Sequence, residues 1–465
     1  MKNASNSTFD SRPPIFGRRI TSVFPKTFSI PHQSTGTIKA GLIVPMLAAE
    51  ILFNLPALLF LRFYLKKHKN KKNRIFRVAY FADCLDEVNG IANNLREVTS
   101  YMRSTGKQAS LIGCAFHTRT RGVIENSYVF LLPRFFSMEA YGYSSTELAL
   151  PHFGQLAKLL MRYPISLLEI ETPSAGGIAI AIAAHIAGIK VISHYRTDAT
   201  GYVRMLVPAK WIHTTVLYFI RIFCKVTRPI VVPCETYKKI LQNELKVPEK
   251  DIAILPRGIA LSSYNPSYRG KGTWENIFHT IKRNARFLYV GRISKEKGLP
   301  FLEEVWHDFH KMHPNAELAF AGDGWYLEIL KKNFKEEENV FYAGNRGGSE
   351  LAGLYADADY FVFPSGTDTF GNVVVEALAS GTPAIVTDKG GPQDIIRNHN
   401  CGYILPFRDK ASWLETFGKC VQGIATEEYS AMRENAKIRS TDFTLDKSAN
   451  AQWKFFEKIC GYKEE

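Results

Sequence analysis

The stretch FPSGTDTFGNVVVEALASG, residues 363–381, decides the fold, because it predicts a buried strand that ends in a polar loop and continues into a helix. A helix that begins directly after a strand presents unpaired backbone N–H groups, which favour an anion. Those amides belong to Phe370, Gly371, Asn372 and Val373. Asp368 and Glu376 flank this helix start, and carboxylates so placed suit sugar hydroxyls better than phosphate. The alternative is that Asp368 caps the helix and Glu376 lies on the surface.

A second strand-to-helix connection, YVGRISKEKG at residues 289–298, carries two cations. Arg292 and Lys297 lie five positions apart on the predicted loop. They can converge on one diphosphate, because ligands of parallel sheets bind at the carboxyl ends of the strands. The alternative is an ordinary polar loop with solvated charges. Gly322 and Gly324 follow another predicted strand in the sequence AGDG, which is a weak signal by itself.

Short apolar strands alternate with amphipathic helices over most of the chain, as is typical of parallel sheets covered by helices. The predicted strands form two series: Arg77–Phe81, Leu168–Ile170, Lys190–His194 and Ile230–Val232, then Arg286–Val290, Glu317–Ala321, Val340–Tyr342, Tyr360–Pro364 and Pro383–Thr387. We therefore predict an α/β chain with two doubly wound, Rossmann-like domains. Their expected bounds are 75–270 and 280–447, after an extension at 1–74 and before a C-terminal helix at 448–465.

Two polar clusters follow strands of the first predicted domain. The sequence DCLDEVNG ends in Gly90, whose missing Cβ would let the backbone approach a phosphate closely, although an ordinary turn is equally consistent. The sequence SHYRTDATGY, residues 193–202, suits hydroxyl recognition and charge stabilisation. Its candidate site residues are His194, Arg196, Asp198 and Tyr202. A helix start capped by Asp198 or Thr200 is the alternative.

Positive charge is concentrated at the N-terminal end of the chain. The net charge is +15, and residues 1–77 hold 14 of the 59 Lys and Arg residues but only two acids. Residues 40–61 form a mostly apolar run interrupted by Glu50 and two prolines, and about 20 apolar residues can span a bilayer. Eight Lys and Arg residues follow between Arg62 and Arg77, so the positive-inside rule places the body of the chain on the cytoplasmic side.

We predict that this segment attaches the chain to an anionic membrane surface, as a single-pass span or as an interfacial helix. A buried core helix followed by solvated charges is the alternative. No nucleic-acid partner is expected, because the basicity is confined to the extension and no zinc finger or RNA-binding aromatic pattern occurs. The seven cysteines form no C-x-x-C pair, which indicates a reducing compartment and no cysteine metal site.

Taken together, these segments resemble glycosyltransferase family 4, whose members are retaining enzymes with the GT-B fold. The resemblance runs from about Phe76 to Cys460 and is specific, because many motifs occur in one order. Besides the motifs above it includes LPRGIALSSYNP at 255–266 and TDKGGPQDII at 387–396. The first-half segments VNGI and RTDATGYVR look like the branch that contains mannosyl- and glycolipid-forming enzymes.

The resemblance implies a donor, a GDP- or UDP-linked sugar, bound mainly by the second domain. Arg292 and Lys297 would neutralise its diphosphate. The amides of residues 370–373 would hold phosphate and sugar. Glu376 would bind the ribose hydroxyls and Asp368 those of the sugar. The AGDG glycines belong to the same donor site.

The same resemblance assigns the acceptor to the first domain, with Asp198 and Tyr202 on the acceptor side. Gly90 would let that domain close over the diphosphate. No metal and no cofactor is expected, because fixed cations and helix-end amides can stabilise the departing nucleoside diphosphate. Retention in such enzymes is commonly explained by front-face attack, so no covalent nucleophile is predicted.

Two departures from the family pattern bear on the chemistry. The first acid of the donor motif is usually Glu and here is Asp368, one methylene shorter. The related branch commonly has His-Thr-Asp where this chain has Arg196-Thr197-Asp198. Either Arg196 replaces the imidazole or His194, two residues earlier, takes its role, and the sequence leaves both open.

The leading hypothesis is a membrane-associated retaining glycosyltransferase. It would move a hexose, mannose or glucose, from a nucleotide sugar to a lipid-linked, glycan or membrane-surface acceptor. Two alternatives remain: a GT-B-fold epimerase acting on a nucleotide sugar, and a non-catalytic nucleotide-sugar-binding scaffold. Acceptor-dependent release of nucleoside diphosphate would distinguish transfer from both.

Overall fold

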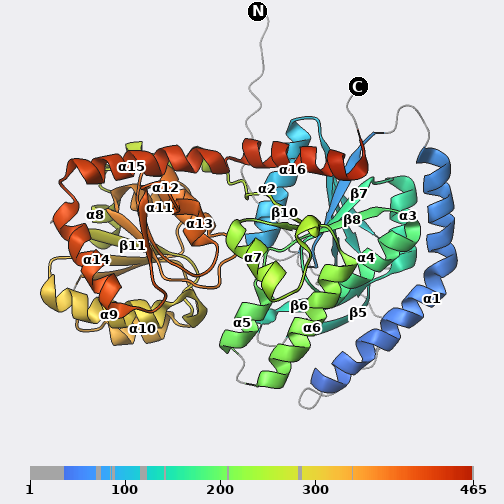
Figure 1. The fold of residues 1–465 in the computed structure, drawn as a ribbon, viewed down its shortest axis with the longest axis horizontal. Helices are drawn as coiled ribbons and strands as arrows, with labels where there is room; N and C mark the ends of the chain where they lie inside the picture. The colour runs from blue at the N-terminus through green and yellow to red at the C-terminus, as the bar shows by residue number, and fades with distance from the viewer. Residues whose placement is uncertain are drawn as a thin grey trace, which may run out of the picture. The chain divides into compact units, whose positions relative to one another are not determined.

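The computed structural model describes residues 36–69, 75–83, 85, 90–115, 123–140, 143–206, 209–280, 285–337 and 339–462. Val44–Glu465 forms one compact unit. The predicted α/β class with two parallel sheets is confirmed (Figure 1). Among the described residues, no helix is long and apolar enough to cross a membrane.

The first sheet has eight strands in the order β10-β9-β8-β7-β1-β2-β4-β3, all parallel except β3. Their bounds are β1 Arg77–Phe81, β2 Gln108–Cys114, β3 Ile124–Asn126, β4 Val129–Leu132, β7 Leu167–Ile170, β8 Lys190–His194, β9 Ile230–Val232 and β10 Ile252–Ile254. The helices between them are α2 Gly90–Ser104, α3 Phe153–Arg162, α4 Ala175–Ala187, α5 Ala199–Leu206, α6 Lys210–Val226 and α7 Glu235–Asn243. A separate hairpin pairs β5 Arg134–Ala140 with β6 Tyr143–Pro151.

The second sheet has six parallel strands in the order β13-β12-β11-β14-β15-β16. Their bounds are β11 Arg286–Val290, β12 Glu317–Ala321, β13 Val340–Gly344, β14 Tyr360–Phe363, β15 Ala384–Thr387 and β16 Gly402–Leu405. The helices that accompany them are α8 Thr273–Phe278, α9 Leu299–Met312, α10 Leu327–Asn333, α11 Gly348–Asp357, α12 Asn372–Ala379, α13 Pro392–Ile396, α14 Lys410–Gly423 and α15 Glu427–Ser440. All nine predicted strands are present within two residues of their expected ends. The prediction missed β2, β3, β4, β5, β6, β10 and β16.

The last helix, α16 Leu445–Cys460, packs against the first sheet although it follows the second in sequence (Figure 1). The hydroxyl of Tyr80 on β1 lies 3.1 Å from Gln452 Oε1, and Trp453 meets Phe76 edge-on. Burial of these aromatic and aliphatic side chains stabilises the arrangement, at about 25 cal/mol per Å² of apolar surface. The two ends of the chain's globular part are therefore joined in one core.

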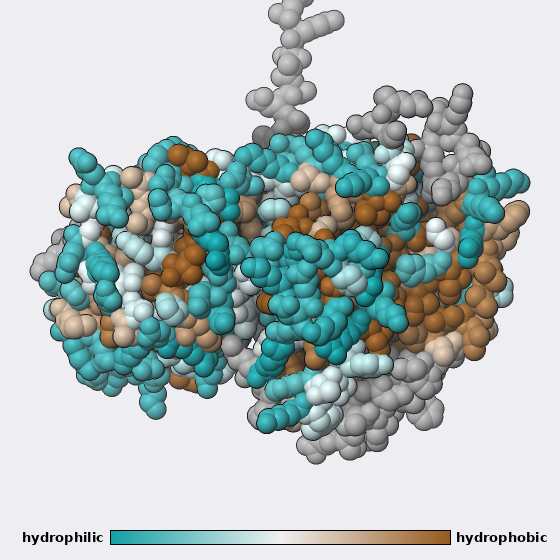
Figure 2. Space-filling view, in the orientation of Figure 1, coloured by the Kyte–Doolittle hydropathy of each residue, from teal (hydrophilic) through white to brown (hydrophobic). Residues whose placement is uncertain are grey.

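Helix α1, Gly36–Lys69, has two unlike faces from residue 50 onward. One face is buried: Glu50 accepts a 2.8 Å hydrogen bond from the Phe153 amide at the start of α3, and Leu58, Leu61 and Leu65 lie in the interior. The opposite face exposes Leu52, Phe53, Leu59, Phe60 and Phe63. Figure 2 shows hydrophobic surface at the right of the view, where α1 runs in Figure 1. The acid that interrupts the apolar run therefore serves packing against α3.

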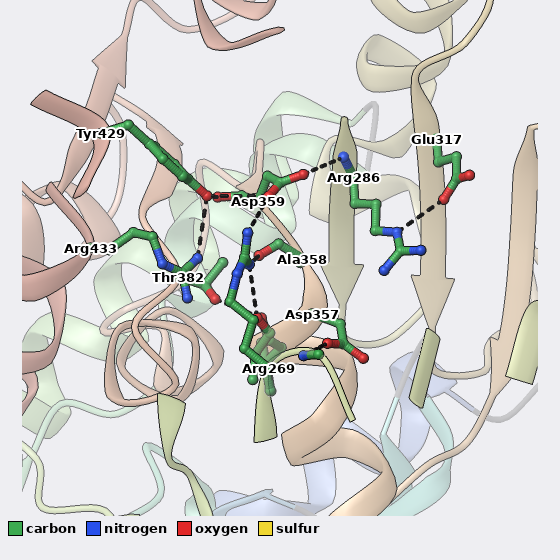
Figure 3. Close-up of polar contacts among 12 residues, drawn as sticks. Arg269, Arg286, Glu317, Asp357, Ala358, Asp359, Thr382, Tyr429 and Arg433 are labelled. Carbon is green, nitrogen blue, oxygen red and sulfur yellow. Dashed lines mark hydrogen bonds and ion pairs between the residues drawn. The ribbon is translucent and has the colours of Figure 1, made fainter. Parts of the chain in front are cut away.

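Charged groups at the amino ends of the second sheet's strands form a structural clamp (Figure 3). Arg269 donates to Asp359, 2.6 Å away, and to the main-chain oxygens of Ala356 and Ala358. Asp359 also accepts from the Arg286 amide at the start of β11. This network lies at the strand ends opposite to those that carry the donor motifs, so it fixes the chain entering the sheet rather than a ligand.

Candidate functional site

Lys297 and Asp368 form an ion pair at the carboxyl end of the second sheet. Lys297 Nζ lies 2.8 and 2.9 Å from the two carboxylate oxygens of Asp368, and the Ser365 hydroxyl donates to the same group. Lys297 ends a 3-10 turn that follows β11, and Gly298, at φ +79°, turns the chain into α9. Asp368 is therefore paired with a cation rather than used as a helix cap.

The predicted helix start is α12, which begins at Asn372 with Gly371 at φ +100° before it. Asn372 Oδ1 is buried and has no hydrogen-bond partner among the described residues. Phe370 is buried against Phe443, and Val373 is partly buried in the core. An unmet acceptor beside a helix N-terminus is suited to a ligand that brings hydroxyl groups together with an anion.

Glu376, one turn into α12, is held by two phenols. The Tyr355 hydroxyl donates to Glu376 Oε2 across 2.9 Å, and Tyr264 hydrogen-bonds to the same carboxylate. Burial raises the pKa of Glu376, and these hydrogen bonds oppose that rise. The carboxylate is thus preorganised rather than a mobile surface group, which disfavours the alternative of a surface Glu376.

Arg292 lines a cavity of about 320 Å³ at the carboxyl ends of β11, β12 and β13. The other lining residues are Val290, Gly291, Ala321, Gly322, Asp323, Asn345, Arg346 and Leu351. Gly322, at φ +138°, approaches the Gly291 carbonyl so closely that a Cβ would collide with it, and Gly324 approaches Ile293 in the same way. The AGDG glycines are therefore required by backbone packing at the cavity.

Arg292 is half-exposed, and its Nε lies 3.8 Å from Glu296 Oε1. Asn345 and Arg346 follow β13 and were not predicted as site residues from the sequence. Their position directly after a predicted strand was the signal that could have identified them. The carboxyl ends of neighbouring parallel strands meet at one edge of the sheet, where ligands bind.

The first sheet carries a second polar cluster at the ends of β7 and β8. Arg196 is buried and pairs through Nε and Nη2 with Glu171, and its Nη1 donates to Asn94 on α2 across 2.9 Å. The ion pair raises the pKa of Arg196 against the lowering effect of burial. Arg196 is therefore a fixed structural cation in this state rather than a free group aimed at a substrate.

His194 stands beside Glu169 in the same cluster. Its Nδ1 lies 3.4 Å from Glu169 Oε1, and neither ring nitrogen has a hydrogen-bond partner among the described residues. Burial, then the cations Arg196 and Arg257, hold the pKa of His194 well below its usual range. Burial and Glu171 raise the pKa of Glu169 well above its usual range. His194 is therefore neutral near pH 7, and burial disfavours the ionised form of Glu169.

The remaining first-domain candidates have different places. Asp198 Oδ1 accepts hydrogen bonds from the Thr200 hydroxyl and the Gly201 amide at the start of α5. Asp198 therefore caps this helix, as in the alternative interpretation of the sequence. Its Oδ2 accepts from Tyr237 across 3.2 Å. Tyr202 lies in α5, but its side chain is outside the described set. Gly90 opens α2, and residues 86–89 before it are also outside the described residues.

The family models match both halves of the chain. Residues 88–263 match the model described as Glycosyltransferase Family 4, and residues 272–439 match the model described as Glycosyl transferases group 1. The chain belongs to glycosyltransferase family 4. It is a glycosyltransferase, and a nucleotide-sugar donor is typical of the family.

Among curated family 4 relatives, the sulfoquinovosyl transferase of Arabidopsis thaliana is 26% identical over 66% of this chain, and the match spans 58% of that relative. The alpha-monoglucosyldiacylglycerol synthase of Streptococcus pneumoniae is also 26% identical, over 66% of this chain and 70% of the relative. A GDP-mannose-dependent alpha-mannosyltransferase of Mycobacterium tuberculosis is 27% identical over 71% and 84%, respectively.

Solved structures support the GT-B fold expected for family 4. The sucrose-phosphate synthase of Thermosynechococcus elongatus superposes with a TM-score of 0.66 and 16% identity, covering 83% of this chain and 99% of that one. At this identity the likeness concerns the fold alone. The predicted fold class is thereby confirmed.

Proposed function

We propose that the chain is a retaining glycosyltransferase that moves a hexose, mannose or glucose, from a GDP- or UDP-linked sugar to a lipid-linked or membrane-surface acceptor. The observation that carries the donor half is the Lys297–Asp368 pair beside α12. A cation that would neutralise the diphosphate and a carboxylate that would bind the sugar hydroxyls lie side by side there, which suits cleavage of the bond between sugar and diphosphate.

The chemistry follows from the charges at the carboxyl end of the second sheet. Breaking the bond between sugar and diphosphate creates an oxocarbenium-like centre and a leaving group with growing negative charge. Lys297, Arg292 and the α12 amides would stabilise that leaving charge, since preorganised donors act most strongly where charge develops. Glu376 would fix the ribose, and no covalent nucleophile is needed if the acceptor attacks from the face of the departing phosphate.

Two alternatives to transfer are less well supported. An epimerase would need acid and base side chains at the sugar, and Asp368 is engaged as the partner of Lys297. A scaffold would not require a carboxylate held by two phenols at the predicted ribose site. Family membership also favours transfer.

The proposal of a lipid-linked or membrane-surface acceptor rests on the relatives and on helix α1. One relative is named for a glucosyldiacylglycerol product and another for sulfoquinovosyl transfer. The exposed apolar face of α1 is followed by the basic run from Arg62 to Arg77, a pairing suited to an anionic lipid surface. We therefore assign α1 as an interfacial helix that holds the enzyme against the cytoplasmic face of a membrane.

The donor is tested with full-length protein and a panel of UDP, GDP, ADP and their glucose and mannose conjugates. A ligand at 100 times its dissociation constant should stabilise the protein by about 2.7 kcal/mol, which thermal denaturation detects. Release of nucleoside diphosphate is then measured with and without lipid vesicles that carry candidate acceptors. Acceptor-dependent release supports transfer. Absence of any thermal shift from folded protein would overturn the donor site.

The membrane contact is tested by substitutions on the exposed face of α1, since deleting the whole helix would uncover its buried leucines. Phe53→Ser combined with Phe60→Ser should reduce sedimentation with phosphatidylglycerol vesicles at least tenfold and leave the thermal midpoint unchanged. Ile438→Ser, at an exposed position of α15, is the matched control. Equal sedimentation of the double variant and the wild type would contradict the assignment.

A further inference from the structure

Arg257 lies between the two sheets in sequence, after β10, and no role has been given to it above. Its Nε and Nη2 atoms are buried and have no hydrogen-bond partner among the described residues. These two nitrogens form one edge of the guanidinium, the edge that binds a phosphate or carboxylate side-on through two parallel hydrogen bonds. A buried donor left without a partner costs about 1–3 kcal/mol, so a matching acceptor is favoured.

Among the described residues around it, Arg257 is a cation without an ion-pair partner of its own. Arg196 is matched by Glu171, and Lys297 by Asp368. The charges of Arg196, Glu171, Glu97 and Asp368 all act on Arg257, which therefore lies near both ion pairs. Burial and then Arg196 lower the pKa of Arg257 to about 9, so the guanidinium is still charged at neutral pH.

The backbone beside Arg257 is anchored to the first sheet's helix layer. Asn94 on α2 donates from Nδ2 to the main-chain oxygen of Gly258 across 3.3 Å, while its Oδ1 accepts from Arg196. A Cβ on Gly258 would collide with Ser448 on α16. The segment that carries Arg257 is thus held by α2 and α16, so the unpaired edge of the guanidinium is carried by a fixed backbone.

We propose that Arg257 binds a phosphate group of a substrate side-on, beside the Lys297–Asp368 pair. The proposal rests on the proposed glycosyltransferase function and deepens it, since it adds an interdomain cation to the substrate site. The phosphate has two possible sources: the distal phosphate of the nucleotide sugar, or a phosphate carried by the acceptor. In both cases Arg257 contacts the substrate directly and its charge offsets that of the bound phosphate.

The test compares Arg257→Gln and Arg257→Lys with wild type and with Arg397→Gln, a control at an exposed arginine. Calorimetry measures the affinities of UDP and GDP against those of UMP and GMP. If the donor supplies the phosphate, the preference for diphosphate over monophosphate falls at least tenfold in Arg257→Gln. Arg257→Lys should recover part of this preference, because Lys keeps the charge but lacks the two parallel N–H donors of the guanidinium.

A second arm tests the acceptor as the source. Protein saturated with nucleoside diphosphate is titrated with inorganic phosphate, and the shift in thermal midpoint is followed. Loss of that shift in Arg257→Gln, with the diphosphate preference intact, assigns the phosphate to the acceptor. If both the preference and the shift match those of wild type, the proposal is overturned. If wild type itself binds no nucleotide, the proposed function fails instead.

The unliganded stability gives an independent readout. Removing an unmatched buried cation near Arg196 should leave the thermal midpoint of Arg257→Gln equal to or above that of wild type. A large drop would mean that Arg257 has a structural partner, and it would contradict the proposal. If Arg257→Gln does not fold, Arg257→Lys still decides the case through the same two affinities.

Discussion

Thr369 donates a hydrogen bond from its hydroxyl to the main-chain oxygen of Arg196 across 2.7 Å. The contact joins the loop before α12 on the second sheet to the turn after β8 on the first. Tyr237 adds a second link, because its hydroxyl lies near both Asp198 and the Thr367 oxygen. The loop that carries Asp368 is therefore positioned by the first domain as well as by its own.

This link predicts a selective effect of Thr369→Val. Loss of the hydroxyl leaves a buried carbonyl without its partner, at a cost of about 1–3 kcal/mol. We expect a five- to tenfold loss of turnover with a smaller change in the affinity for nucleoside diphosphate, measured by steady-state assay and calorimetry. Thr369→Ser, which keeps the hydroxyl, should retain activity. Equal losses in both variants would point to packing of the methyl group instead.

Substitutions of Lys297 and of Asp368 are predicted to have opposite effects on nucleotide binding, because the two side chains form an ion pair. Lys297→Met removes a cation from the diphosphate site and should weaken nucleoside diphosphate binding at least tenfold. Asp368→Asn removes the carboxylate that competes for Lys297, so diphosphate should bind equally well or more tightly while turnover falls. Calorimetry separates the two. If Asp368→Asn weakens diphosphate as strongly as Lys297→Met, the two side chains do not compete.

Glu376 is expected to recognise ribose, and this is tested with both the protein and the ligand. Glu376→Gln should weaken the affinity for UDP or GDP about tenfold, because a carboxylate accepts stronger hydrogen bonds than an amide. The same substitution should cost little for the 2′,3′-dideoxy nucleotide. Tyr355→Phe, which removes one phenol from Glu376, should give a smaller version of the same pattern. A loss that is independent of the ribose hydroxyls would move Glu376 out of the sugar contact.

Arg292 is predicted to stabilise the leaving charge. Arg292→Ala should lower turnover about 100-fold or more, as removal of a single charge-stabilising donor does elsewhere. Arg346→Ala, which alters the same cavity beside β13, is the comparison, and a smaller effect on turnover is expected there. Full activity of Arg292→Ala in a steady-state assay would remove it from the site.

Much of the fold could be predicted because the signal was local. Buried strands such as β11 and β14 are continuous apolar runs that end in Gly or Pro, and each strand-to-helix loop is contiguous in sequence. The β5–β6 hairpin was missed because its strands carry Ser, Thr, Glu and Met, without an apolar run. Strands β10 and β16 are short edge strands in which Leu405 is the one buried residue.

The first-domain cluster could not be predicted because its partners are distant in sequence. Parallel pairing of β7 with β8 places Ile170 beside Ser193, and this register brings Glu171 to Arg196. Nothing in the sequence around Arg196 indicates that pairing. Arg257 lies within the motif at 255–266, but its unpaired edge is evident only once Arg196 is seen to pair with Glu171. Arg196 is tied to Glu171, so His194 is the remaining candidate for the role of the family's imidazole. His194 is buried, and its pKa is lowered.

The neutral state of His194 predicts a pH dependence of stability. Its pKa is depressed in the folded protein, so the unfolded chain binds more protons below about pH 6.5. The contribution of neutral His194 to the free energy of unfolding is present above that pH and is lost as the pH falls. Between pH 7 and 5.5, wild type should lose about 1 kcal/mol of unfolding free energy more than His194→Gln does.

Glu169 gives the opposite sign, because its pKa is raised in the folded state. The contribution of Glu169 to the free energy of unfolding is present below its unfolded pKa and declines as the pH rises. Wild type should therefore gain stability relative to Glu169→Gln as the pH falls from 7 to 5.5. Urea denaturation of the three proteins at both pH values measures both effects. Parallel shifts in all three would mean that neither pKa differs between the folded and the unfolded protein, which contradicts both predictions. A gain of stability by wild type over His194→Gln at pH 5.5 would instead mean that His194 is charged when the protein is folded.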